Sequence, residues 1–210
     1  MKRARVMKWL TAVLLMLLAT AGTVLILVPN QSWYHYLYER QGMSETTGVS
    51  VFEAEFNYDY MVDQVMGHQA VTGMASFASG EHLQKRLSQL AMVYQISEWV
   101  CGIGIVLIVG CLILLRNQKW YECFRYGSMV TGIGTGLLCL GTVLWRPLRL
   151  FVFKNRYGEL FGMDPGFTEL LPEKWACYMW LTGVGLLLVM ALVFLLIYAG
   201  SSRSYRPHRF

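Results

Sequence analysis

The chain has 210 residues, of which 55% are hydrophobic and 15% are charged, and its formal net charge at pH 7 is +5. Soluble domains carry about 25% charged residues. The deficit here, together with long apolar runs, leaves too little chain for a large soluble domain. The positive charge does not indicate a nucleic-acid-binding protein, because it is concentrated in short segments beside the apolar runs.

Four apolar runs are long enough to cross a membrane as helices, which takes about 20 residues each. The first run is too long for the apolar region of a secretory signal peptide and lacks a polar cleavage region, so we expect it to remain as a membrane anchor. The sequence therefore predicts an all-α membrane protein with four transmembrane helices in a single membrane domain over residues 1–210. The four runs cover residues 10–28, 92–115, 126–145 and 175–199.

The basic residues predict how the chain is oriented. Three short segments, 1–9, 116–125 and 200–210, hold ten of the 18 Lys and Arg residues. The two long loops, 29–91 and 146–174, hold the other eight and eleven of the 13 acidic residues. Short basic loops stay on the cytoplasmic side. We therefore expect a multi-pass protein of the cell membrane, with both termini in the cytoplasm and its basic ends near anionic lipid headgroups.

The first outer loop begins with an aromatic cluster and a turn-rich stretch, 41–48. Tryptophan and tyrosine favour the headgroup level, where the ring is half buried and its polar atom is hydrated. We expect the histidine of this segment, His35, to pack at that interface. The four aromatic residues of the cluster are Trp33, Tyr34, Tyr36 and Tyr38.

A helix over residues 51–66 is predicted next in this loop. Ser50 and Glu53 have the spacing of a capping box, in which each side chain satisfies a backbone donor of the other. An aromatic residue recurs every fourth position behind the cap, and we expect these residues to form the apolar face of an amphipathic helix. The recurring residues are Phe52, Phe56 and Tyr60.

A second helix is expected to start near Ser79 and to continue into the second span, with Leu83, Leu87 and Leu90 along one stripe. We expect both helices of the loop to lie on the membrane surface rather than to form an independent folded domain.

The second outer loop is basic at its start and acidic later. The sequence Asp164-Pro165-Gly166 is typical of a turn, and Pro172 with Glu173 fits the first turn of the last span. Within the third span, Gly132 and Gly136 have the spacing of small residues that lets membrane helices approach closely.

Few residues could carry chemistry. His82 follows Glu81 at the outer end of the second span, and a histidine there suits general acid–base work or is simply a surface residue. Glu98 is the acidic residue inside a membrane run, so we expect it either near the interface within reach of water or in an inner pocket. The five cysteines lack the spacing of a metal site, and we expect neither a metal nor a cofactor.

The order of these segments resembles the lipoprotein intramolecular transacylase (Lit) family of low-GC Gram-positive bacteria, and the resemblance covers nearly the whole chain. It rests on three groups of residues, each weak alone and specific in order and spacing on four spans. They are Trp33-Tyr34 through Tyr38-Glu39 with Gly42-Met43 and Asp63; Phe77 through Glu81; and Phe153-Lys154-Asn155, Asp164-Pro165 and Leu171-Pro172-Glu173.

The resemblance implies that the chain moves a fatty acyl chain within a diacylated lipoprotein, from the glyceryl sn-2 oxygen to the amine of the lipid-modified N-terminal cysteine. No cofactor is needed, because breaking one ester supplies the acyl group of the amide. The partners implied are membrane lipids and diacylated lipoproteins, and we expect a monomer or a small homo-oligomer. The site residues implied, or placed beside them, are Glu81, His82, Arg149, Asn155 and Asp164.

The sequence departs from this family at its two histidine positions. Gln84 stands at the first and Arg149 at the second. His82 lies two residues from the first position, about 200° away around a helix, so it is a poor substitute. Arginine stays protonated and cannot act as a base, although it could hold an oxyanion or a headgroup phosphate.

Three hypotheses follow. The chain is a Lit-like acyltransferase with altered catalytic groups, a relative that has lost catalysis and binds lipid or lipoprotein, or an unrelated four-span scaffold or transporter accessory. We expect Glu81, Arg149, Asn155 and Asp164 to converge at the outer face in either of the first two cases.

Overall fold

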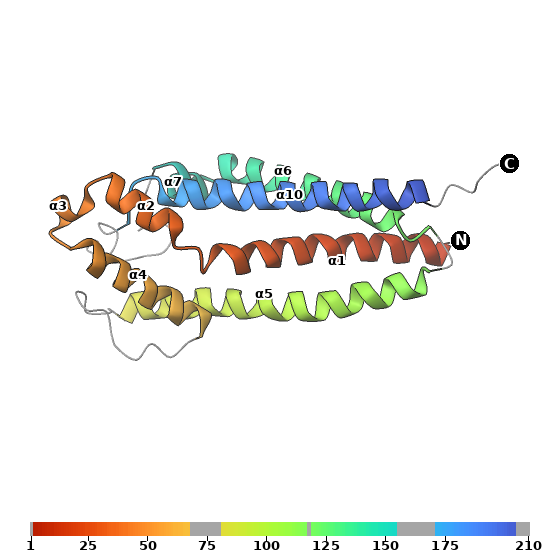
Figure 1. The fold of residues 1–210 in the computed structure, drawn as a ribbon, viewed down its shortest axis with the longest axis horizontal. Helices are drawn as coiled ribbons and strands as arrows, with labels where there is room; N and C mark the ends of the chain where they lie inside the picture. Colours follow the sequence, from red (N-terminus) through yellow and green to blue (C-terminus); the bar gives the residue numbers. More distant parts are fainter. Residues whose placement is uncertain (1, 68–80, 117–118, 155–170, 205–210) are drawn as a thin grey trace. The chain divides into compact units, whose positions relative to one another are not determined.

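The computed structural model describes residues 2–67, 81–116, 119–154 and 171–204, and within these ranges the chain forms helices and no strand (Figure 1). The helices, in chain order, are α1 (Lys2–Leu27), α2 (Ser32–Arg40), α3 (Met43–Thr47), α4 (Val51–Met66), α5 (Glu81–Leu114), α6 (Glu122–Leu144), α7 (Arg146–Lys154) and α10 (Trp175–Ser204).

Among the described residues, four helices are long and apolar enough to cross a membrane, which confirms the predicted all-α membrane fold. Their candidate spans are longer than the apolar runs at several ends, because a helix continues past the hydrocarbon core wherever its backbone hydrogen bonds can continue. The candidate spans are Arg3–Leu27, Leu87–Leu114, Glu122–Leu144 and Trp175–Arg203.

The chain divides into two compact units, the first made of three segments and the second of two. The first unit contains Met1–Thr23, Ser97–Cys139 and Gly183–Phe210, and the second contains Val24–Ile96 and Leu140–Thr182. The assignment of one domain to residues 1–210 stays a prediction.

In the first unit, four helices share one apolar core, and a salt bridge joins two of them. Lys8 Nζ of α1 donates to Glu122 Oε2 of α6 at 2.7 Å. Half-buried hydrophobic residues surround the core, among them Leu14, Leu112 and Tyr198. The buried core residues are Leu15 and Ala19 of α1, Ile108 of α5, Phe124 of α6, and Leu187 and Phe194 of α10.

The close approach of α1 and α6 uses different glycines from those expected. A Cβ atom at Gly127 would lie 2.8 Å from Leu15 Cδ1, and one at Gly134 would lie 3.3 Å from Met16 Sδ. Gly132 and Gly136 have no described atom within 4 Å of such a Cβ. The small-residue spacing at 132 and 136 is therefore not the contact face, because the face toward α1 is rotated around the helix.

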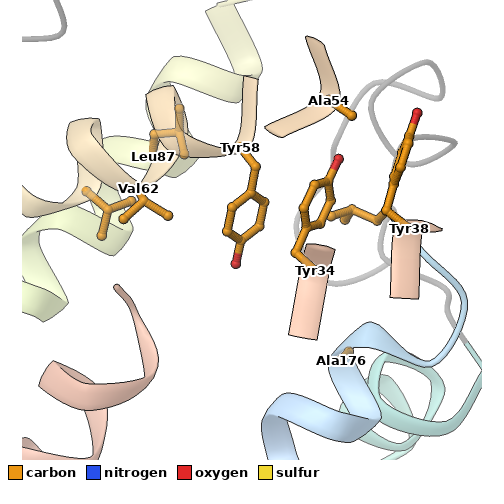
Figure 2. Packing of buried hydrophobic residues seen from close by; sticks show 9 residues of the cluster. Tyr34, Tyr38, Ala54, Tyr58, Val62, Leu87 and Ala176 are labelled. Carbon is orange, nitrogen blue, oxygen red and sulfur yellow. The ribbon is translucent and has the colours of Figure 1, made fainter. Parts of the chain in front are cut away.

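The second unit has an aromatic core, which Figure 2 shows from close by. Its tyrosines come from α2 and α4, so the segment expected to lie at the headgroup level contributes to a packed core, and its depth in the membrane stays a prediction. Helices α2 and α3 occupy the segment in which the sequence predicted an aromatic cluster followed by a turn. Gly42, between the two helices, has a left-handed φ of 59°. The buried core residues are Tyr34, Tyr38, Ala54, Tyr58, Val62, Val65, Leu87, Leu171 and Ala176.

Helix α4 confirms the expected bounds but not the expected face. Ser50 Oγ accepts a hydrogen bond from the Glu53 amide at 3.2 Å, as the capping box predicts. Phe52, however, is 78% exposed, and Phe56 is exposed as well. The buried stripe is Ala54, Tyr58, Val62 and Val65, which recurs at the same helical spacing. The predicted buried face of α4 was therefore wrong, because the prediction gave more weight to the large aromatic rings than to the smaller apolar residues.

The remaining elements hold two further differences. Helix α5 runs without a break from Glu81 into its span, as expected. The first difference is helix α7 (Arg146–Lys154), which lies in a segment that the sequence predicted only as a loop. Helix α10 begins at Trp175 rather than at Pro172, because Lys174 has a φ of 64°, a left-handed conformation that a continuous helix cannot contain.

Candidate functional site

An apolar cavity of about 250 Å³ lies within the second unit. Its walls come from the last turn of α1, the inner face of α4, the first turns of α5, helix α7 and the start of α10. Because a cavity lined by apolar side chains is a poor place for water, it is suited to a hydrocarbon ligand. The lining residues are Val24, Leu27, Val28, Tyr58, Met61, Val62, Val65, Leu87, Leu90, Val93, Phe151, Leu171, Trp175 and Met179.

Of these lining residues, only Tyr58 and Trp175 carry side-chain hydrogen-bonding groups. Burial raises the pKa of Tyr58 to about 12, while the nearby indole N–H of Trp175 lowers it and the nearby Asp59 carboxylate raises it. Tyr58 is therefore neutral at physiological pH, and the described wall of the cavity carries no charge.

A row of three tyrosine rings supports the wall from the side of α2. Figure 2 shows Tyr34 between Tyr58 and Tyr38. The rings of Tyr34 and Tyr58 stack with centroids 4.2 Å apart and an interplanar angle of 14°, and the Tyr34 and Tyr38 centroids are 5.7 Å apart. Burial raises the pKa of Tyr34 as well. The stack holds α4 against α2, so that the apolar stripe of α4 faces the cavity.

Two contacts from the segment between α1 and α4 fix the edge of the cavity at the start of α10. The Gln41 side chain forms two hydrogen bonds with the backbone of Glu173, donating through Nε2 to the carbonyl and accepting at Oε1 from the amide, each at 2.9 Å. The indole N–H of Trp33 donates to Thr182 Oγ1 at 2.8 Å. Leu171 and Trp175, which line the cavity, are therefore positioned from residues more than 130 places earlier in the chain.

A polar cluster lies on α2 and α4 beside the stacked tyrosines. His35 Nδ1 is 3.7 Å from Glu55 Oε1. Within the described ranges, the buried atoms His35 Nε2 and Asp59 Oδ1 have no hydrogen-bond partner. Burial raises the pKa of Asp59, His35 lowers it, and the neighbouring acids Asp63 and Glu55 raise it. His35 is thus an electrostatic partner of an acidic helix face and not only an interfacial packing residue.

The structure describes only some of the residues expected at the site. Glu81 and His82 form the first turn of α5, where only the backbone is described, and Gln84 is exposed. Arg149 is exposed on α7. Asn155 and Asp164 lie outside the described residues, so the convergence of the site residues stays a prediction.

Glu98 has an exposed side chain on α5, next to Trp99, which is 71% exposed. It does not line the described cavity. Glu98 lies eleven residues inside the candidate span Leu87–Leu114, so its interfacial position stays a prediction.

The apolar cavity itself was not predicted from the sequence. Only one part of its wall left a signal, in the spacing of Tyr58, Val62 and Val65 along a second apolar stripe of α4. A helix with one apolar stripe buried and another exposed has more apolar surface than a simple surface helix needs.

No family model matches this sequence, and no curated protein matches it in sequence. Solved structures do match it in fold. The structure of the membrane integral lipoprotein intramolecular transacylase Lit from Bacillus cereus superposes with a TM-score of 0.81, at 14% identity, and covers 97% of each chain.

Two variant structures of Lit from Bacillus cereus match equally well. One has a histidine replaced by arginine and gives a TM-score of 0.80 at 13% identity, covering 98% of this chain and 96% of that one. The other has a histidine replaced by alanine and gives 0.80 at 12% identity, covering 97% and 95%. The chain is therefore a multi-pass membrane protein with the fold of Lit over nearly its whole length.

Proposed function

We propose that this chain is a divergent Lit-like protein that holds an acyl chain of a membrane lipid or diacylated lipoprotein in the cavity of its second unit. The observation that carries the proposal is the cavity, whose fourteen described lining residues are apolar apart from one hydroxyl and one indole N–H. Burying hydrocarbon in such a site releases about 25 cal/mol for each Å² removed from water. The shared fold supports a ligand of the same chemical class.

We further propose that the chain binds this ligand without transferring the acyl group. Transfer needs a group that takes a proton from the attacking amine. At the two positions where the resembled family has histidine, this chain has Gln84, an amide without a titrating group, and Arg149, which stays protonated. His82 lies on another side of the α5 helix from Gln84.

In the cell we place the protein in the cytoplasmic membrane, with the cavity end outside. The basic segments at residues 1–9, 116–125 and 200–210 support this orientation. Acylated lipoproteins and their lipids reach that surface, so the cavity would open at the level of its ligand.

Filling the cavity tests the binding proposal. Val65→Trp adds a large ring to the cavity wall, whereas Leu188→Trp adds the same ring to an exposed position of α10. We expect a lipid with a photoreactive acyl chain to cross-link to peptides of α4 and α5 in the parent protein and in the Leu188 variant. The same cross-links should fall about tenfold in the Val65 variant. Equal cross-linking in all three proteins would contradict the proposal.

A further inference from the structure

Helix α7 carries three exposed cations at the edge of the cavity. Val152 is 1% exposed and Phe151 lines the cavity, whereas Arg146, Arg149 and Lys154 are all exposed. A helix turns about 100° per residue. Arg146 and Arg149 therefore fall on one side, and Phe151 points away from them toward the cavity.

The helix is held at the end of a membrane span. It starts two residues after α6 ends at Leu144. The ring of Phe153 packs edge-on against Trp180 of α10 with centroids 6.1 Å apart, and Trp180 donates to Thr142 Oγ1 of α6 at 3.1 Å. The cations of α7 are therefore fixed at the level where the hydrocarbon core ends.

Aromatic rings flank these cations. Trp145 is 59% exposed and Phe153 is 49% exposed. Two arginines on one face and a lysine in the last turn, with exposed aromatic rings beside them, is the pattern of a helix that lies in the headgroup layer. In the described part of the chain, none of the three cations forms an ion pair.

We propose that Arg146, Arg149 and Lys154 bind the phosphate of an anionic glycerophospholipid whose acyl chain occupies the cavity. This inference rests on the proposed function, because it names the ligand of the same cavity. Guanidinium groups match phosphate with paired hydrogen bonds, and basic residues at this level attract anionic lipids. A free phosphate ion would leave the exposed rings and the apolar wall of Phe151 without a role, so the ligand is a lipid of the bilayer.

The inference also gives Arg149 a role that a histidine could not fill. An arginine at this position keeps its charge at every physiological pH. It therefore serves as a permanent phosphate ligand at the position where the resembled family has histidine. On this view the replacement exchanges a titrating group for one that recognises a headgroup.

The test compares headgroups on one photoreactive acyl chain. The full chain is placed in phosphatidylcholine nanodiscs with a trace of photoreactive phosphatidylglycerol or photoreactive phosphatidylcholine, and cross-links to the peptides that contain Val93, Phe151 and Met179 are counted by mass spectrometry. We expect phosphatidylglycerol to label these peptides about tenfold more than phosphatidylcholine. The triple variant Arg146→Gln, Arg149→Gln, Lys154→Gln should lose this preference and keep its phosphatidylcholine labelling, which shows that the cavity is intact.

Two further variants control for charge. Arg116→Gln, Lys119→Gln, Arg203→Gln removes three exposed cations beside or at the ends of the other span helices and should keep the preference. Arg146→Lys with Arg149→Lys retains the charge and should keep part of the preference for phosphatidylglycerol. An excess of inorganic phosphate should leave the cavity cross-links unchanged.

Three results would overturn the inference. They are equal labelling by the two lipids in the parent protein, an equal loss of preference in the control triple variant, and displacement by inorganic phosphate, which would indicate a free-anion site. Equal labelling would leave the proposed acyl cavity standing. Absence of cavity labelling by either lipid would refute the cavity function together with this inference.

Discussion

Single side chains set the electrostatics around the cavity, and Asp59 is the clearest case. It lies on α4 between Glu55 and Asp63, one helical turn from each, and one of its oxygens is buried without a hydrogen-bond partner in the described chain. Burial favours the neutral carboxyl group. His35 opposes this effect, so the cluster balances one imidazole against three acids.

We predict that Asp59→Asn stabilises the protein at neutral pH. The raised pKa of Asp59 means that its contribution to stability is fully present below the unfolded value of about 3.9 and is lost as the pH rises through the folded value. The difference in Tm between variant and parent should therefore grow from pH 4 toward pH 7. Thermal unfolding in detergent measures it, with Asp63→Asn as a neighbouring control. A variant less stable than the parent at pH 7 would show that Asp59 forms a favourable ion pair.

The pattern of charges in the sequence did not predict the cluster of His35 with the three acids of α4. The sequence shows that Glu55, Asp59 and Asp63 share a face of a helix, but it does not show that His35 from another helix lies beside them. That contact depends on the stacking of Tyr34 on Tyr58, which is a tertiary packing event. Site residues that depend on packing between separate elements are therefore the part that the sequence could not supply.

The existence of the long helices could be predicted from the sequence, whereas the choice of their buried faces could not. All four spans and α4 follow from long or periodic apolar patterns, which carry a strong signal. α2 and α7 were missed because nine-residue helices hold too few turns for a clear period. The face of α4 was misassigned because phenylalanine outweighs alanine and valine in any hydrophobic count, whereas the packing against Tyr34 favours the small Ala54.

The contact between α1 and α6 gives a second prediction. Gly127→Ala should destabilise the protein by about 1–3 kcal/mol, because the added methyl group would lie against Leu15 in a packed core. Gly132→Ala adds the same group where no described atom is near, and it should be neutral or slightly stabilising through helix propensity. The two Tm values in one detergent compare them directly. Equal destabilisation by both substitutions would contradict the assigned contact face.

The whole molecule combines a membrane bundle with a cavity-bearing unit, and the distribution of charge predicts its orientation. Every expected cytoplasmic segment is short and basic, while the loops that contribute α2, α3, α4 and α7 carry most of the acids. The family resemblance and the four spans could be read from the sequence because they depend on order and composition. The cavity could not, since its walls come from five separate helices.

Orientation is tested by labelling. Glu45→Cys lies on α3 and Lys119→Cys lies before α6, both at exposed positions. With the native cysteines replaced, an impermeant thiol reagent should label position 45 in intact cells and position 119 only after the membrane is permeabilised. The reverse pattern would place the cavity end in the cytoplasm and would contradict the proposed access to lipoproteins.

A protein that binds acyl chains without transferring them is tested most directly by mass spectrometry of lipoprotein N-termini, in a host that lacks a transacylase. We predict that cells expressing this chain keep the diacylglyceryl form with a free amine. The double variant Gln84→His, Arg149→His is the change we expect to produce some lyso-form lipoprotein, and Arg149→His alone should not suffice, because two positioned proton-transfer groups act together. Abundant lyso-form lipoprotein from the unmodified chain, abolished by His82→Ala, would contradict the loss of catalysis and show that His82 acts as the base.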